Sequence, residues 1–159
     1  MIDAHFIQTL IAAALWSFGA AAAFGYIYNI DAKSIVWAAA AGSCGWTVYT
    51  AVSALTGAQP ASYFWGACCI AALAELFAII LKNPATVYLV PGLLPLVPGG
   101  GMFQTMREAV QGNMDTALQT GFTALTAAGA IALGVALASS AVRVVLYAAQ
   151  RLMRRNTPS

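Results

Sequence analysis

Charged residues are scarce in this sequence. Asp, Glu, Lys and Arg together make up 8% of its 159 residues, whereas hydrophobic residues make up 61%. Soluble domains are about a quarter charged, so this chain cannot cover a water-exposed surface with charge. Its net charge of +2 is also too small for a surface that follows nucleic-acid phosphates. The composition excludes a soluble domain, a disordered chain and a nucleic-acid binder, and it indicates an integral membrane protein.

Side chains that bind metals or act in catalysis are also few. His5 is the single histidine, and Cys44, Cys68 and Cys69 lie in apolar segments without a C-x-x-C spacing. The sequence contains no recognisable pair of catalytic carboxylates and no triad pattern. We therefore expect no metal site, no cofactor and no enzymatic activity, and we interpret the thiols as small packing groups.

Long segments without charge divide the chain into candidate spans. A spanning helix needs about 20 mostly apolar residues. The uncharged segment 34–74 is too long for one helix, and the turn-forming residues 56–62 interrupt it. We predict an all-α, polytopic protein in which residues 1–159 form a single membrane domain with five transmembrane helices and a basic cytoplasmic tail, 143–159. The predicted spans are about 5–28, 34–55, 63–81, 84–106 and 116–142.

Lys and Arg are unevenly distributed between the two sides of this topology. With the N-terminus outside, six of the seven basic residues lie in cytoplasmic segments and only Arg107 lies outside. Because cytoplasmic loops carry the excess of Lys and Arg, we predict an outside N-terminus and a cytoplasmic C-terminus. Aromatic residues near the predicted span ends are expected to anchor the protein at the interfaces; they are Tyr26, Tyr28, Trp37, Tyr63, Trp65, Tyr88 and Tyr147.

The predicted fourth span is rich in helix-breaking residues. It contains four of the six prolines and the triplet Gly99–Gly101, so a regular helix from Pro91 to Gly101 is not expected. Non-helical backbone at membrane depth is tolerated where it is buried in protein or lines a wet cavity, and broken helices form substrate sites in transporters. If a half-helix restarts at Met102, its free N–H groups point back at the glycines and favour an anion. The alternative is a kinked helix whose glycines only permit tight packing. The candidate substrate-binding or gating residues here are Pro91, Gly92, Pro95, Pro98, Gly99, Gly100, Gly101 and Arg107.

Polar residues inside the other spans supply further candidates. Glu75 is the only acid inside a predicted span, and a charge at mid-bilayer costs at least about 2.5–3.5 kcal/mol. It is a candidate for proton coupling, or else a structural carboxylate near Lys82. Thr120 and Thr123 belong to a threonine stripe that either lines a polar path or joins helices by hydrogen bonds.

The segment from Tyr88 to Phe103 resembles a known signature. It reads Pro91-Gly92-Leu93-Leu94-Pro95-Leu96-Val97-Pro98-Gly99-Gly100-Gly101 at its centre, which is similar to the P-G-x-x-P-L-V-P-G-G-G signature of the threonine/serine exporter (ThrE) family. The chain length, the five predicted spans and the preceding Asn83-Pro84 also resemble the small C-terminal half of that family, which occurs as a separate subunit of the YjjB type.

This resemblance implies a function and a partner. The family exports small metabolites: threonine and serine in fused members, and a dicarboxylate such as succinate in split members that pair with a larger YjjP-type subunit. Export would depend on an ion gradient across the bacterial inner membrane, and the two subunits would form an inverted five-plus-five plan. Two other hypotheses stay open, a homo-oligomeric channel or pore and a membrane scaffold that transports nothing.

Overall fold

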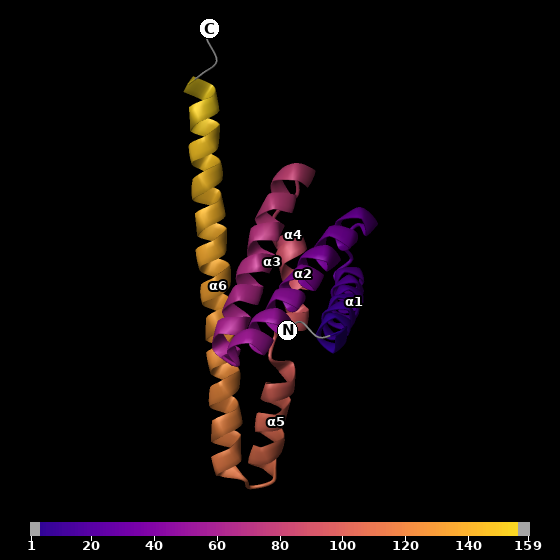
Figure 1. Ribbon diagram of the computed structural model, residues 1–159, viewed down its shortest axis with the longest axis vertical. Helices are drawn as coiled ribbons and strands as arrows, with labels where there is room; N and C mark the ends of the chain where they lie inside the picture. Colours follow the sequence, from indigo (N-terminus) through magenta and orange to yellow (C-terminus); the bar gives the residue numbers. More distant parts are fainter. Residues whose placement is uncertain (1–3, 156–159) are drawn as a thin grey trace.

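A computed structural model describes the backbone of residues 4–155 and the side chains of residues 6–146, and the described chain is helical (Figure 1). Three helices and one bent pair lead into a long final helix. The elements are α1 (Ala4–Ile27), α2 (Ala32–Thr56), α3 (Gln59–Leu81), α4 (Thr86–Leu93), the 3₁₀ turn η1 (Leu94–Leu96), α5 (Gly99–Val110) and α6 (Met114–Arg155). Four helices are long and apolar enough to cross a membrane, and the bent pair brings the number to five. The predicted all-α membrane architecture is thus confirmed.

Local signals explain where the first helices begin and end. Asp31 caps α2 by accepting a hydrogen bond from the Ser34 N–H at 3.0 Å. Gly57 ends α2 in the left-handed conformation, with φ of 64°. Pro60 lies in the first turn of α3, where its missing N–H costs nothing. The interruption expected over residues 56–62 is therefore only a short turn at residues 57 and 58.

The fourth span is broken over a shorter stretch than expected. α4 continues through Pro91, and η1 extends it to Leu96. Val97 is extended, with ψ of 132°, the conformation that the residue before a proline favours. The helix restarts at Gly99 after a bend of 50°. The restart therefore comes three residues before Met102, and the three glycines form the first turn of α5.

Close contacts between backbones hold α2, α3 and α4 together. A Cβ atom at Gly42 of α2 would lie 3.0 Å from the Gly92 carbonyl oxygen of α4. A Cβ atom at Gly45 would lie 2.9 Å from the Gly66 carbonyl oxygen of α3. Small residues allow such approaches in membrane helices, where the gain comes from van der Waals packing. The buried core lies among these helices; it includes Ala38, Ala41, Ala67, Ile70, Tyr88 and Leu96.

The last helix is longer than the predicted span. α6 packs against α3 along one part and against α5 along another. It contains a candidate membrane span that begins at Met114, and the helix continues to Arg155. The boundary predicted at residue 142 is therefore not a helix end, and the predicted basic tail is helical up to Arg155, while residues 156–159 lie outside the described residues. Figure 1 shows α5 and the start of α6 extending beyond the lower ends of α2 and α3.

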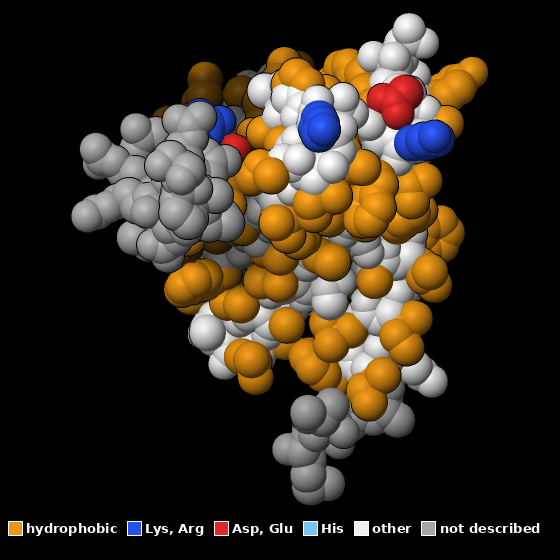
Figure 2. Space-filling model, turned by 90° about the horizontal axis from the view of Figure 1, so that it is seen from above, with side chains coloured by type: hydrophobic (Ala, Val, Ile, Leu, Met, Phe, Trp, Pro, Cys, Tyr) orange, Lys and Arg blue, Asp and Glu red, His pale blue; other side chains and the backbone are white. Residues whose placement is uncertain are grey.

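Basic side chains gather at one end of the bundle. Lys33 begins α2 and Lys82 follows α3, so the antiparallel α2–α3 pair brings them to the same end. Arg143 joins them there through its ion pair with Glu75 of α3. Figure 2 looks down on this end and shows a few charged side chains within an otherwise apolar and uncharged surface.

Most of the aromatic residues expected to act as anchors are accessible from outside the protein. Tyr26, Tyr28 and Trp65 are exposed, which suits a position at the membrane interface. Tyr88 is an exception, because it is fully buried, and its predicted anchoring role is therefore wrong. The side chain of Tyr147 lies outside the described residues.

Candidate functional site

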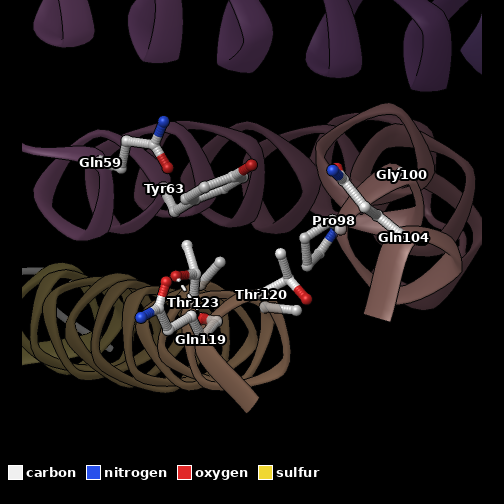
Figure 3. Close-up of a pocket in the computed structure, with 11 residues that line it drawn as sticks. Gln59, Tyr63, Pro98, Gly100, Gln104, Gln119, Thr120 and Thr123 are labelled. Atoms are coloured by element: carbon white, nitrogen blue, oxygen red, sulfur yellow. Dashed lines mark hydrogen bonds between the residues drawn. The ribbon is translucent and has the colours of Figure 1, made fainter. Parts of the chain in front are cut away.

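A polar pocket of about 500 Å³ lies between the start of α3, the start of α5 and the first half of α6 (Figure 3). Five of its lining residues are among those predicted from the sequence: Pro98, Gly100, Gly101, Thr120 and Thr123. The break in the fourth span and the threonine stripe of α6 therefore face a common space. Neither segment by itself would predict this, since 19 or more positions separate Gly101 from Thr120 and Thr123.

Three polar residues of the pocket were not predicted. Gln59 and Tyr63 come from the first two turns of α3 and Gln104 from α5, whereas Gln119 of α6 belongs to the same predicted polar stripe as Thr120 and Thr123. A sequence signal was present for Gln104, because it lies one helical turn after Gly101. No signal pointed to Gln59, whose approach to α5 and α6 depends on how the helices pack.

The pocket presents neutral donors and acceptors. Its described lining contains amides, hydroxyl groups and glycine backbone, and no Asp, Glu, Lys or Arg. The Thr123 hydroxyl donates to the Gln119 carbonyl oxygen at 2.9 Å, and the Thr120 hydroxyl donates to the Thr116 carbonyl oxygen at 2.9 Å. Each hydroxyl oxygen keeps acceptor capacity. Such a lining can hydrogen-bond a small polar solute, and it offers no counter-ion for a net charge.

The other residues predicted for this site lie elsewhere. Pro91 and Gly92 are buried, and Gly92 faces the Ala38 carbonyl oxygen of α2. Pro95 is half-buried in η1, and Gly99 is exposed at the start of α5. Arg107 is exposed in the last turn of α5 and is not among the pocket residues. Gly92 therefore shapes the α2–α4 contact, and the later part of the signature reaches the pocket.

Glu75 is paired at the basic end of the bundle. Its Oε1 atom accepts a hydrogen bond from Arg143 Nε at 2.9 Å and forms an ion pair with Nη2 at 2.8 Å. Its side chain is 10% exposed, whereas that of Arg143 is 70% exposed. The partner is therefore Arg143 of α6, and not the Lys82 suggested by helical spacing. A proton-coupling role for Glu75 stays a prediction, and it would require the carboxylate to leave this guanidinium.

A second polar cluster closes the same end and was missed by the sequence reasoning. The side-chain amide of Asn83 donates to Ser34 Oγ and to the Tyr88 hydroxyl, each at 3.1 Å. The Ser34 and Tyr88 oxygens are 3.4 Å apart. These bonds connect Asn83, in the turn between α3 and α4, to Ser34 at the start of α2 and to Tyr88 in α4. The position of Asn83 directly before a proline was the only signal.

The sequence model of a protein family described as threonine/serine exporter, ThrE, matches residues 13–141. This chain belongs to the threonine/serine exporter family. The match spans most of the chain and includes α2 to α5 and much of α1 and α6. Membership in the exporter family, together with the apolar helices, makes the chain a multi-pass membrane protein with an exporter-type transport role. No curated protein and no solved structure matches the chain.

Proposed function

We propose that this chain is the small subunit of a secondary exporter and that its polar pocket receives the exported solute. The observation that carries the proposal is the meeting of Gly100 and Gly101, at the break of the fourth span, with Thr120 and Thr123 of α6 around one uncharged polar cavity. Broken helices form binding sites in secondary transporters because their backbone can approach the solute.

The chemistry of the lining supports a hydroxyl amino acid as the solute. Threonine and serine are zwitterions without net charge, and they offer donors and acceptors that amides and hydroxyl groups match. A dicarboxylate such as succinate carries two negative charges, which need cationic partners when they are removed from water. Arg107 is the nearest cation along α5, three positions after Gln104, and it lies outside the lining.

Exposed polar side chains support a second subunit. Gln59, Gln104 and Gln119 are exposed in the isolated chain. Polar groups in a membrane-spanning bundle normally face the protein interior or a wet cavity rather than lipid. A larger membrane subunit of the YjjP type would cover them and complete the path. The basic end with Lys33, Lys82 and Arg143 supports a cytoplasmic position for that end, and hence an outside N-terminus, in the bacterial inner membrane.

The test is efflux from proteoliposomes that contain this chain and its larger partner. Vesicles are loaded with labelled threonine, serine or succinate, and a proton or sodium gradient is imposed. We expect gradient-dependent efflux of threonine and serine and little efflux of succinate. Efflux of succinate alone would contradict the assignment of the substrate class. Ion conduction by this chain without partner or gradient would favour the channel hypothesis, and no movement of any solute would favour the scaffold.

A matched pair of variants tests the pocket. Gln119→Leu removes an amide from the pocket, and Gln111→Leu makes the same change just after α5, outside the pocket. Loss of a hydrogen bond worth about 1.4 kcal/mol in the transport step corresponds to about a tenfold loss of rate. We therefore expect Gln119→Leu to slow threonine efflux about tenfold and Gln111→Leu to leave it unchanged. Equal rates for the two variants would remove the pocket from the mechanism.

A further inference from the structure

The glycines at the start of α5 have no steric reason to be glycine in this conformation. Among the described residues, a Cβ atom added at Gly99 or Gly100 would meet nothing within 4 Å, and one at Gly101 would meet only the Ala124 Cβ at an ordinary 3.5 Å. None of the three is among the residues with positive φ. Glycine is the weakest helix former after proline, so three in one helical turn weaken that turn without improving the packing. This combination fits a segment that has to adopt a second backbone conformation.

The packing of α5 leaves it free to move. Within the described part of the chain, α5 contacts no element other than α6, and none of its residues is buried. Its N-cap position is Pro98, which makes no side-chain capping bond. The link to η1 is the extended residue Val97. The helix is therefore joined to the bundle by a short hinge at its start, by its face against α6, and by the turn 111–113 that leads from its end into α6.

One hydrogen bond between side chains fastens that face. Thr105 Oγ1 donates to Thr120 Oγ1 at 3.1 Å, and it also lies 2.8 Å from the Gly101 carbonyl oxygen. A hydroxyl group has a single proton, so Thr105 can donate to α6 or to the glycine turn, but not fully to both. Gly121 of α6 allows Thr105 of α5 to come this close, because a Cβ atom at position 121 would lie 3.1 Å from Thr105 Cγ2.

We propose that α5 is the moving wall of the polar pocket, which pivots about Gly99–Gly101 and is fastened to α6 by the Thr105–Thr120 hydrogen bond. Movement of α5 carries Gln104 toward or away from Gln119 and so opens or closes the pocket. Thr105 is a positioning residue, since it lies outside the pocket lining and acts through its neighbour Gln104. The mechanism rests on the proposed function, but the movement itself can be measured without transport.

The first experiment measures the movement directly. Spin labels are placed at Val110, which is 89% exposed at the end of α5, and at Leu125 of α6, which is 72% exposed, after the native cysteines are replaced by alanine. With a rise of 1.5 Å per residue, a pivot of about 20° at the glycine turn moves Val110 by about 5 Å. We expect the distribution of distances between the two labels to be at least about 5 Å wide. It should become narrower in Gly99→Ala. Thr105→Val should shift the population toward longer distances, and Thr105→Ser should restore it.

The second experiment measures threonine efflux from the same proteoliposomes with the larger partner. Gly99→Ala adds no contact and lies outside the pocket lining; we expect it to slow efflux about fivefold, the factor that matches the helix penalty of one glycine. The control is Gly129→Ala, which makes the same change at an open position of α6 and should leave efflux unchanged.

The two experiments separate the possible failures. A single narrow distance that is the same with and without Gly99→Ala would overturn the moving wall, and so would wild-type efflux rates in Gly99→Ala. A broad distribution that narrows in Gly99→Ala, in a protein that exports no threonine, would support the movement and refute the proposed function.

Discussion

The contact between α3 and α6 provides the sharpest test of how the fold positions the pocket. Gly134 of α6 faces the backbone of α3, and a Cβ atom there would lie 2.6 Å from the Phe64 carbonyl oxygen and 3.1 Å from the Ala67 Cβ. Ordinary contact begins near 3.4 Å, so Gly134→Ala must push the helices apart by about 0.8 Å at this point. The Cys68 thiol, which donates to the Gly134 carbonyl oxygen at 3.4 Å, would move as well.

The expected cost follows from the rigidity of the contact. Overpacking a tight interface destabilises a protein by about 1–3 kcal/mol, and the obstructing atom here is a backbone oxygen that cannot rotate away. The gain in helix propensity from glycine to alanine, about 0.5–1 kcal/mol, offsets part of this. The control is Gly129→Ala, which brings the same gain at a position where no atom of the described part of the chain lies within 4 Å of the added Cβ.

Thermal unfolding in detergent, followed by circular dichroism, compares the two variants. We expect Gly134→Ala to melt below the wild type and Gly129→Ala to melt at or slightly above it. Threonine efflux should fall in Gly134→Ala, because the pocket is built from both α3 and α6. If Gly134→Ala melts as high as Gly129→Ala, the packing argument is refuted.

Three further predictions concern the basic end of the bundle. Tyr88→Phe removes a buried acceptor of the Asn83 amide and should cost about 0.5–1.5 kcal/mol; an unchanged melting temperature would contradict this. A double-mutant cycle with Glu75→Gln and Arg143→Gln should give a coupling of at most about 1 kcal/mol, because Arg143 is 70% exposed and solvent screens such pairs; chemical denaturation measures it, and a coupling above about 2 kcal/mol would be inconsistent with that screening. The Ser34 N–H lowers the pKa of Asp31 below its ordinary value of 3.8, so the stability from this cap is present above that value and is lost as the pH falls through the lower folded-state pKa. Melting curves at decreasing pH should therefore show a larger loss for the wild type than for Asp31→Asn, and equal losses would argue against the cap.

The arrangement of charge and of turn-forming residues determined the membrane architecture by itself. A spanning helix must be long and uncharged, so the gaps between charged residues located α1, α2 and α3 to within a few residues, and the turn-forming residues 56–62 marked the end of α2. The run of prolines predicted the break in the fourth span because proline restricts both itself and the residue before it. These are local effects, and local sequence is sufficient to predict them.

Only the tertiary structure decided which residues share a site. Gln59, Gln104 and Gln119 lie on three helices, and their approach depends on how closely glycine contacts such as Gly134 let α3 and α6 pack. The same holds for Glu75, whose partner is Arg143, 68 positions away, and not Lys82, which lies two helical turns further along the chain. Spacing along a helix specifies a face, but the neighbour of that face is set by side-chain and backbone fit between helices.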